Sequence, residues 1–244
     1  MTNQPAAAET NIREWPEDLT YQEFTKHINH SKDWLIEALY EQKSDQIQVK
    51  NRRIGLKKLK RIVNAAFSIS GKQGYQSMTL RQLCQKADIS MGGLYAYISS
   101  KGELASLIGA GLTILTEDVI NGATKDTVDT KSRLYANICS HLFLSELYSD
   151  WFVFVYMETR AVAKAQRVGF RKIETDFESK LLGLLEQGVD EGRFELGNPY
   201  LTATTLIAQL QNWYIKRWKY EATDFSVDQY AAALIAFLEQ MVIE

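Results

Sequence analysis

The chain has 244 residues, a formal net charge of −2, 45% hydrophobic residues and two cysteines. This length holds one large domain or a small domain plus a larger one, and the hydrophobic share is typical of a folded soluble protein. No apolar run approaches the ~18 residues of a membrane span, and residues 1–20 contain no signal-peptide core, so we expect a cytoplasmic protein without a membrane partner. Cys84 and Cys139 lie far apart without further ligands at metal spacing, which favours reduced core thiols over a disulfide.

Charge is distributed unevenly along the chain. Residues 50–101 contain eleven lysines or arginines and a single acid, Asp88, a net of +10, whereas the remaining residues sum to −12. A basic segment in an otherwise acidic chain favours double-stranded DNA or another polyanion as the partner of that segment. A solvated basic face is the alternative, and the motifs within the segment decide between the two.

The residues before this basic segment fall into two parts. Residues 1–16 lack periodicity and are expected to form a flexible tail. Over residues 20–53 apolar residues recur at helical spacing, and Thr20 with Glu23 has the form of a capping box, so we predict one or two helices. His27 and His30 lie three residues apart, but no third ligand completes a tetrahedral set, which favours surface histidines over a metal site.

The basic segment itself contains three predicted helices. From Lys50 a basic amphipathic helix runs to Gly74. Thr79 and Gln82 then form a capping box that begins a second helix, and Ser90 is a suitable N-cap for a third. Two short helices joined by a tight turn and supported by a longer helix are typical of a helix-turn-helix unit, whose last helix enters the major groove of DNA.

The segment from residue 56 to residue 107 resembles the N-terminal domain of TetR-family transcriptional regulators. The resemblance is carried by Ala65, Ala66 and Phe67; Gly74 and Tyr75; Thr79, Arg81 and Leu83; Ala87, Asp88, Ile89 and Ser90; Gly93, Leu94, Tyr95, Tyr97 and Ile98; and Ser100, Lys101, Glu103 and Leu104. Asp88 stands where the family usually has glycine, and Ile98 where it usually has phenylalanine. The long extension before the unit is atypical of the family, and the resemblance implies no role for it.

The helix-turn-helix pattern and the resemblance together predict the residues that contact DNA. Arg81 has a guanidinium suited to a guanine edge or a phosphate. Tyr95, Tyr97 and Lys101 are expected to clamp phosphates. The start of the third helix offers few polar groups, so part of the specificity is expected from DNA shape and thymine methyl groups. The predicted set is Thr79, Arg81, Gln82, Ser90, Met91, Gly92, Gly93, Tyr95, Tyr97 and Lys101.

The remainder of the chain is predicted to be helical throughout. Helices are expected over residues 104–120, 131–148, 150–166 and 169–191, another from Asn198 and Pro199, and a last one from Ser226 to Val242. We therefore predict an all-α protein in three parts: an N-terminal extension over 1–53, a three-helix helix-turn-helix DNA-binding domain over 54–101, and a larger helical-bundle domain for ligand binding and dimerisation over 102–244.

The last two predicted helices carry more apolar surface than packing on one side requires. The resemblance implies that such a pair forms a four-helix bundle with a second subunit, and a symmetric homodimer matches a palindromic operator. The predicted interface residues are Leu206, Leu210, Tyr214, Tyr230, Leu234 and Phe237. A helical hairpin inside a monomer is the alternative.

An aromatic-rich stretch lies in the middle of the C-terminal domain. Helical bundles hold ligands between their helices, and the resemblance implies a pocket for a small-molecule effector here. The predicted lining is Phe143, Trp151, Phe152, Tyr156, Phe170, Phe177 and Trp213, which indicates a lipophilic, acyl-type effector. Basic residues near this stretch, Arg171 among them, suit an anionic head group. The alternative is an aromatic stripe that only builds the core.

Motifs of enzymes are absent from the sequence: there is no Gly-rich phosphate loop, no G-x-S-x-G elbow and no metal-binding helix motif. His141 follows Ser140 and Cys139, but sequence neighbours do not face one another on a helix. We therefore expect no catalytic residue, metal or cofactor. The sequence predicts a DNA-binding transcriptional regulator, a repressor released from its operator by a small ligand; the alternative is a self-associating helical protein that does not bind DNA.

Overall fold

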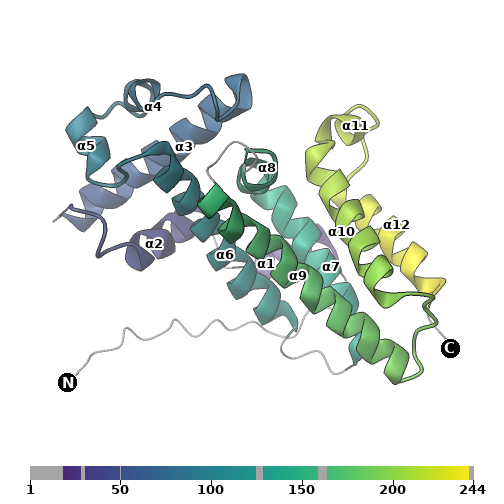
Figure 1. The fold of residues 1–244 in the computed structure, drawn as a ribbon. Coiled ribbons are helices and arrows are strands. Elements are labelled where there is room, and N and C mark those ends of the chain that lie inside the picture. The colour runs from purple at the N-terminus through teal and green to yellow at the C-terminus, as the bar shows by residue number, and fades with distance from the viewer. Residues whose placement is uncertain (1–18, 29–30, 50, 125–128, 159–163, 242–244) are drawn as a thin grey trace, which may run out of the picture.

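The computed structural model of the protein describes residues 19–28, 31–49, 51–124, 129–158 and 164–241. Regular secondary structure in these ranges is helical (Figure 1), which confirms the predicted all-α class. The helices are α1 (Tyr21–His27), α2 (Lys32–Gln42), α3 (Arg52–Gln73), α4 (Leu80–Ala87), α5 (Met91–Tyr95), α6 (Lys101–Thr124), α7 (Thr130–Leu147), α8 (Ser149–Glu158), α9 (Lys164–Asp190), α10 (Pro199–Ile215), α11 (Arg217–Glu221) and α12 (Val227–Glu239).

Some predicted features lie outside the described residues, namely the tail over residues 1–16, His30 and Val242. Within the described ranges no cluster of three or more potential metal ligands is found. No helix in the same part of the chain is both long and apolar enough to cross a bilayer. Cys84 and Cys139 are buried free thiols, as predicted.

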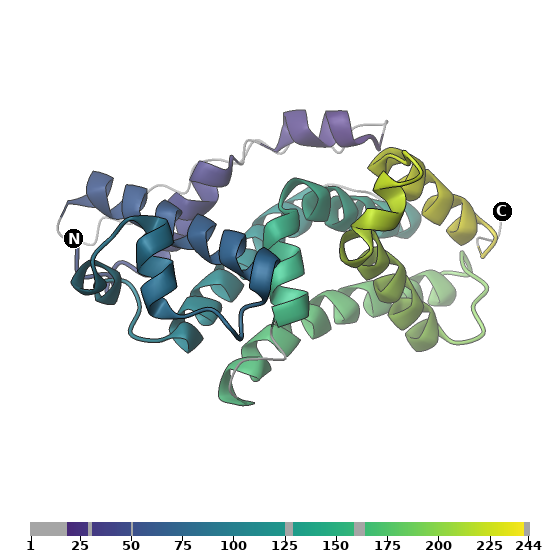
Figure 2. The ribbon, with the colours of Figure 1, turned by 90° about the horizontal axis from the view of Figure 1, so that it is seen from above.

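The N-terminal extension folds into two helices that pack on the rest of the protein. In α1 the Thr20 hydroxyl accepts a hydrogen bond from Glu23 N–H at 3.3 Å, and Ser31 caps α2 in the same way. In Figure 2 these two purple helices run along one side of the molecule, from near α12 to the helix-turn-helix unit. α1 packs on α7, whereas α2 packs on α3 and α6. The extension is therefore in contact with both larger parts of the chain.

Helices α3, α4 and α5 form the predicted three-helix unit at one end of the molecule (Figure 1). The capping box of α4 is complete: Gln82 N–H donates to Thr79 Oγ1 at 3.1 Å, and Thr79 N–H donates to Gln82 Oε1 at 2.9 Å. Asp88 follows α4 with φ of 49°, a left-handed conformation that aspartate tolerates better than most residues. The tight turn before α5 therefore forms without the glycine that is usual there.

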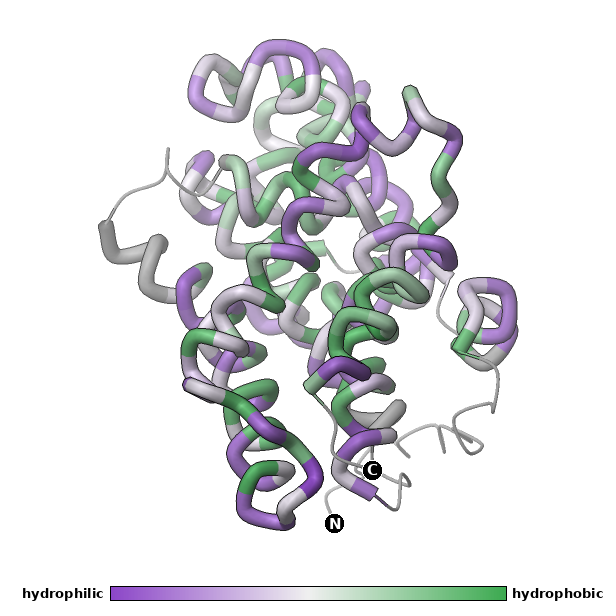
Figure 3. Tube along the Cα trace, turned by 90° about the vertical axis from the view of Figure 1, so that its right-hand side faces the viewer, coloured by the Kyte–Doolittle hydropathy of each residue, from purple (hydrophilic) through white to green (hydrophobic). Residues whose placement is uncertain are grey.

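The larger part of the chain is a bundle in which α6 packs on α7, α8 and α9, α10 packs on α9, and α12 packs on α7. Hydrophobic and hydrophilic segments alternate along these helices (Figure 3), as expected where one face of each helix is buried. α6 is longer than the predicted helix over 104–120, and α8 ends at Glu158, before the end of the predicted helix over 150–166. The helix predicted from Asn198 and Pro199 is divided at Lys216 into α10 and α11. Gly192 follows α9 with φ of 69°, a left-handed conformation that glycine adopts readily.

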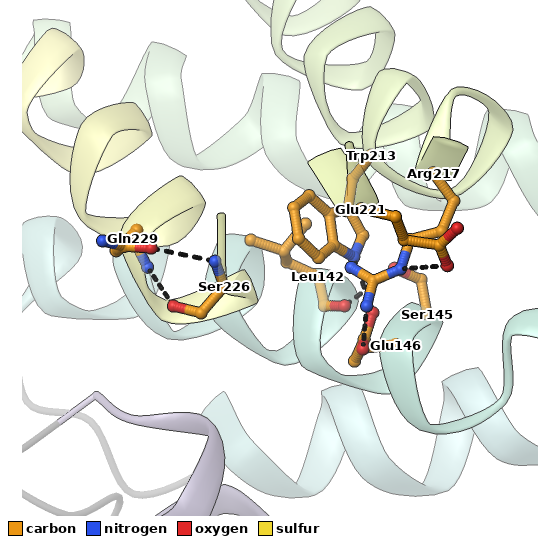
Figure 4. Close-up of polar contacts among 8 residues, drawn as sticks. All are labelled: Leu142, Ser145, Glu146, Trp213, Arg217, Glu221, Ser226 and Gln229. Atoms are coloured by element: carbon orange, nitrogen blue, oxygen red, sulfur yellow. Dashed lines mark hydrogen bonds and ion pairs between the residues drawn. The ribbon is translucent and has the colours of Figure 1, made fainter. Parts of the chain in front are cut away.

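A partly buried polar cluster fixes the end of α10 and the start of α11 to α7 (Figure 4). Trp213 Nε1–H donates to Glu146 Oε2 at 3.0 Å, and Arg217 Nη2–H donates to the other oxygen of the same carboxylate at 2.9 Å. The Arg217 guanidinium also lies 4.5 Å from the centre of the Trp213 ring, a cation–π distance. Figure 4 also shows the capping box of Ser226 and Gln229, which begins α12 at the predicted position.

Helix α8 joins the helix-turn-helix unit to the bundle through aromatic side chains. The ring of Phe67, on α3, lies 5.2 Å from that of Trp151 and 5.8 Å from that of Phe154, both at steep angles. The Phe154 ring also lies 5.0 Å from that of Tyr75, in the loop after α3. Edge-to-face pairs of this kind contribute about 0.5–1.5 kcal/mol each beyond the area that they bury. α3 and α8 are therefore packed as one continuous core.

Candidate nucleic-acid interface and ligand cavity

The exposed surface of α4, α5 and their N-caps holds most of the residues predicted to contact DNA. Gly93 is half-buried, and the exposed members are Thr79, Arg81, Gln82, Ser90, Met91, Gly92 and Tyr95. Tyr95 is the most prominent aromatic of this surface, with 52% of its area exposed. Two hydroxyls of the set also act in caps, since Thr79 caps α4 and Ser90 Oγ accepts from Gly93 N–H at 3.0 Å. These residues are thus accessible to a partner, and their contact with DNA stays a prediction.

Helix α5 is only one turn long, so its position depends on neighbouring elements. Leu94 is fully buried beneath it, and Ile98 is 2% exposed. Arg61, on α3, donates to the carbonyl oxygen of Asp88 at 2.8 Å and forms an ion pair with the carboxylate of the same residue. This contact fixes the turn between α4 and α5 to the supporting helix.

The structure revises the predicted roles of Tyr97 and Lys101. Tyr97 is 6% exposed and donates through its hydroxyl to the carbonyl oxygen of Gly55 at 3.0 Å. Burial raises the pKa of this phenol to about 12. Lys101 Nζ donates to the carbonyl oxygens of Tyr75 and Gln76 at 3.2 and 2.7 Å. Both side chains hold the unit together. Tyr97 is too buried to clamp a phosphate, whereas the half-buried Lys101 ammonium keeps one of its three N–H donors for such a contact.

Part of the basic charge of α3 is neutralised by α2. Arg52 pairs with Glu41 at 2.7 Å, and Lys60 pairs with Asp33. The side-chain hydrogen bond to Glu41 raises the pKa of Arg52. Among the described residues no ion pair engages several other cations of this segment, namely Arg53, Lys57, Lys58, Arg81 and Lys86. These unpaired cations give the unit its positive surface.

A cavity of about 280 Å³ lies within the bundle, with walls from α6, α7, α8, α9 and α10. Four of the predicted lining residues contribute to it, namely Phe152, Tyr156, Phe170 and Phe177. The other lining residues are Leu112, Thr116, His141, Val155, Arg171, Ile173, Glu174, Ile207, Gln211 and Tyr214. Gly109 makes room for one wall, because a Cβ there would lie 2.6 Å from Phe170 Cε1.

Three aromatic residues of the predicted lining belong to the core instead. Phe143 packs against Phe24 of α1 with ring centres 5.4 Å apart, Trp151 packs against α3, and Trp213 belongs to the polar cluster with Glu146. Aromatic composition alone does not distinguish the two environments. Apart from Arg171, the polar members of the wall were missed because no sequence motif marks them.

A chain of hydrogen bonds crosses the cavity wall. The Tyr156 hydroxyl donates to Gln211 Oε1 at 2.8 Å, and Gln211 Nε2–H donates to Glu174 Oε1 at 2.8 Å, which links α8, α10 and α9. The His141 ring stacks on Phe177 with centres 4.3 Å apart. Burial lowers the pKa of His141 to about 3, so the imidazole is neutral at physiological pH. Burial likewise raises the pKa of Tyr214.

The structure also revises the predicted dimer interface. Four members of that set are buried within a single protomer, namely Leu206, Leu210, Tyr214 and Leu234. Tyr230 is half-buried and donates to the carbonyl oxygen of Gln209 at 2.7 Å, whereas Phe237 is 52% exposed. The exposed residues of the two helices include small or polar ones, namely Thr205, Ala208 and Gln209 of α10 and Gln229, Ala232, Ala233 and Ala236 of α12. Three large apolar side chains are exposed beside them, namely Tyr200 and Leu201 of α10 and Phe237 of α12.

A basic helix-turn-helix unit packed on a helical bundle with an internal cavity defines a ligand-responsive DNA-binding regulator. Residues 62–108 match the family model of bacterial regulatory proteins of the tetR family, and residues 127–242 match the tetracyclin repressor-like C-terminal domain. The chain belongs to the TetR family of transcriptional regulators. It is accordingly a DNA-binding regulator of transcription, as the sequence predicted.

Individual relatives are similar over most of their length. The HTH-type transcriptional regulator HbdR of Aromatoleum sp. (strain CIB) is 22% identical over 169 residues, which cover 69% of this chain and 73% of the relative. The structure of AibR in complex with isovaleryl coenzyme A and operator DNA superposes with a TM-score of 0.66 at 17% identity and covers 74% of this chain and 97% of that one. FadR of Bacillus subtilis in complex with stearoyl-CoA gives a TM-score of 0.60 at 18% identity, with 73% and 96% covered.

Proposed function

We propose that this chain acts as a homodimeric transcriptional repressor that leaves a palindromic operator when an acyl-coenzyme A binds in the cavity of the bundle. The ligand class is supported by the fold shared with AibR and FadR, whose structures contain isovaleryl coenzyme A and stearoyl-CoA. It is also supported by the mainly apolar wall of the cavity. In this proposal residues 1–53 form an extension, 54–101 the DNA-binding domain and 102–244 the effector and dimerisation domain.

The DNA-reading surface in this proposal comprises α4 and α5. Tyr95 and Arg81 are its main contacts, because both are exposed and neither is held by an ion pair among the described residues. Thr79, Gln82, Ser90, Met91, Gly92 and Gly93 complete it. Gly92 would allow close approach of the backbone to DNA, since a Cβ there meets nothing within 4 Å.

The dimer in this proposal forms through the exposed face of α10 and α12. Ala232, Ala233 and Ala236 are small, so a partner helix approaches closely, and Phe237 supplies a large exposed apolar group. A twofold dimer of this kind presents two copies of α5 to successive major grooves. Phe237→Asp should yield a folded monomer in light scattering, whereas Leu234→Asp should unfold the chain because Leu234 is buried in its own protomer.

The observation that carries the proposal is that α8 borders both functional parts, alongside α6, which connects them in the chain. α8 contributes Phe152 and Tyr156 to the cavity wall, and its Trp151 and Phe154 pack on α3 and on the loop that follows it. Suppose that a ligand binds more tightly to the conformation of the protein with α8 in one of two positions. Because α8 packs on α3, that ligand also favours one position of α3. No other helix of the described bundle combines cavity residues with aromatic packing on α3.

The test is a titration of the DNA upstream of the protein's own gene, followed by fluorescence anisotropy at fixed salt, since salt strongly changes such affinities. We expect specific binding that is reversed by an acyl-coenzyme A and not by coenzyme A alone. Tyr95→Phe should weaken the binding with little change in folding. Equal affinity for unrelated DNA would overturn the proposed operator specificity, and the absence of any DNA binding would favour the self-associating helical protein.

A further inference from the structure

Helix α2 presents a line of acidic side chains to α3. Asp33, Glu37 and Glu41 follow one another at intervals of four residues, so they share one face of α2. Lys60 pairs with Asp33, and Arg52 pairs with Glu41 at 2.7 Å and with Glu37 at 3.8 Å. These side chains are about half exposed, and exposed ion pairs contribute little to stability. The main effect of the acids is therefore to neutralise the side of α3 that faces α2.

A different side of α3 carries cations without such partners. Ile54, Lys57 and Lys58 lie in line with Arg61 at helical spacing, and we call the first three residues the α3 ridge. Ile54 is 49% exposed, Lys57 is exposed and Lys58 is half-buried. Within the described ranges neither lysine of the ridge forms an ion pair. Positive charge is therefore open to a partner on this side of α3 and neutralised on the side toward α2.

The α3 ridge runs beside α5. In Figure 1 α3 has α2 on one side and the α4–α5 pair on the other, and both α2 and α4 pack on it. Arg61 donates to the carbonyl oxygen of Asp88 at 2.8 Å, in the turn before α5. The hydroxyl of Tyr97, just after α5, donates to the carbonyl oxygen of Gly55 at 3.0 Å. The two ridge lysines lie between these contacts along α3, so both ends of α5 are fixed next to the ridge.

The start of α3 is electrostatically unfavourable for the helix itself. Arg52 and Arg53 occupy its first turn, which contains no acid. The positive end of a helix dipole lies at the N-terminus and disfavours cations there. An anion beside this end would reduce the repulsion among these charges. A face that is only solvated gains nothing from this arrangement, whereas a polyanion-binding face does.

We infer that the α3 ridge binds the sugar-phosphate backbone that borders the groove entered by α5, and that the acids of α2 confine this contact to one side of α3. The ridge precedes residue 62, where the match to the family model begins. Phosphate contacts position a protein on the duplex, whereas base contacts specify the sequence. The ridge lysines thus add affinity for any duplex. This inference rests on the proposed function in one respect, namely that α5 enters a groove of DNA.

The experiment is the salt dependence of DNA binding by the full chain, followed by fluorescence anisotropy. Two duplexes of equal length are used, the DNA upstream of the protein's own gene and an unrelated sequence. Each lost phosphate contact lowers the slope of log affinity against log salt by about 0.9, and a homodimer has two copies of each residue. We expect Lys57→Gln to lower the slope by about 1.8 on both duplexes, and to weaken binding about tenfold or more at ~0.1 M salt.

The matched control is Lys60→Gln, which removes the same charge from the same helix, three residues further along. Because Lys60 is already paired with Asp33, we expect its slope to stay close to that of the parent. Lys58→Gln is the second ridge variant, and it decides should Lys57→Gln fail to fold. Equal reductions in the ridge variants and in Lys60→Gln would indicate an effect of net charge and overturn the inference. Unchanged slopes in both ridge variants would also overturn it.

The two duplexes separate this inference from the proposed function. Reduced slopes of the ridge variants, with no preference of the parent for the upstream DNA, would support the inference and overturn the operator specificity of the proposal. A preference for the upstream DNA with unchanged slopes would support the proposal and overturn the inference. Failure of the parent to bind either duplex would overturn both.

Discussion

The backbone N–H of Gln48 donates to the carbonyl oxygen of Ala96 at 2.9 Å, so the segment after α2 is hydrogen-bonded to the C-terminal end of α5. At the other end of the extension, Tyr21 N–H donates to Asp228 Oδ1 of α12 at 2.6 Å. Phe24, 1% exposed, packs on Phe143 between these two contacts. The extension thus connects the far end of the bundle with the end of the proposed reading helix.

Replacement of Gln48 by proline removes the donor of this hydrogen bond. We expect Gln48→Pro to lower the free energy of unfolding by about 1 kcal/mol, the usual net value of one hydrogen bond, and to weaken DNA binding because the end of α5 loses its support. Urea denaturation and anisotropy measure the two effects. Gln48→Ala keeps the N–H and is the control. A proline variant that matches the alanine variant in both assays would show that the contact is unimportant.

The two tyrosines of the third helix region should behave in opposite ways. Tyr97→Phe loses a buried hydrogen bond to Gly55, so we expect a loss of about 0.5–1.5 kcal/mol in stability with unchanged DNA affinity. Tyr95→Phe removes an exposed hydroxyl and should leave stability within about 0.5 kcal/mol while DNA affinity falls. Thermal denaturation and anisotropy on both variants make the comparison. The reverse pattern would restore Tyr97 to the DNA-reading surface.

Replacement of two helical glycines by alanine should change the free energy of unfolding in opposite directions. A Cβ at Gly111 would lie 2.3 Å from Trp151 Cζ3, so Gly111→Ala must displace the ring that packs on Phe67. We expect a loss of about 1–3 kcal/mol and reduced coupling between effector and DNA. Gly183, in α9, meets nothing within 4 Å, and Gly183→Ala should gain about 0.5–1 kcal/mol from helix propensity. Chemical denaturation distinguishes them, and equal effects would contradict the packing argument.

Stability should depend on pH through His141. Burial lowers its pKa from 6.5 to about 3, so below pH 6.5 the unfolded chain binds a proton that the folded chain does not. Above pH 6.5 protonation of His141 therefore does not lower the free energy of unfolding. As the pH falls from 6.5 toward 3, this free energy decreases by up to about 1.4 kcal/mol per pH unit because of this group. Urea unfolding at several pH values within this window should show a shallower dependence for His141→Phe. Parallel curves would indicate that the ring is protonated in the folded state.

The local features of this fold could be predicted from short stretches of sequence. The capping boxes at Thr79 and Ser226, the N-cap at Ser90 and the turn at Asp88 depend on residues that lie within a few positions of one another. Helix starts and stops are therefore readable without knowledge of the tertiary structure. The same holds for the basic segment, because charge density does not depend on packing.

Assignments that depend on burial were less accurate for one shared reason. Helical spacing shows that a helix has an apolar face, but not whether its own chain or a partner covers that face. Leu206 and Leu234 are covered by the same protomer, which left Phe237 as the exposed apolar side chain of the predicted interface. Tyr97 follows Leu94 by three positions, a spacing that already indicated the interior.

The sequence by itself determined the all-α class, several helix caps, the basic helix-turn-helix unit and the family. Tertiary structure decided which aromatic rings line the cavity and which fill the core, because Phe143 and Phe177 differ only in what packs against them. It also decided that His141 packs among aromatic rings, where its Nδ1 atom has no hydrogen-bond partner among the described residues. A third such property is the contact of the extension with both α12 and the end of α5. These properties arise from contacts between residues far apart in the sequence, and local periodicity contains no information about such contacts.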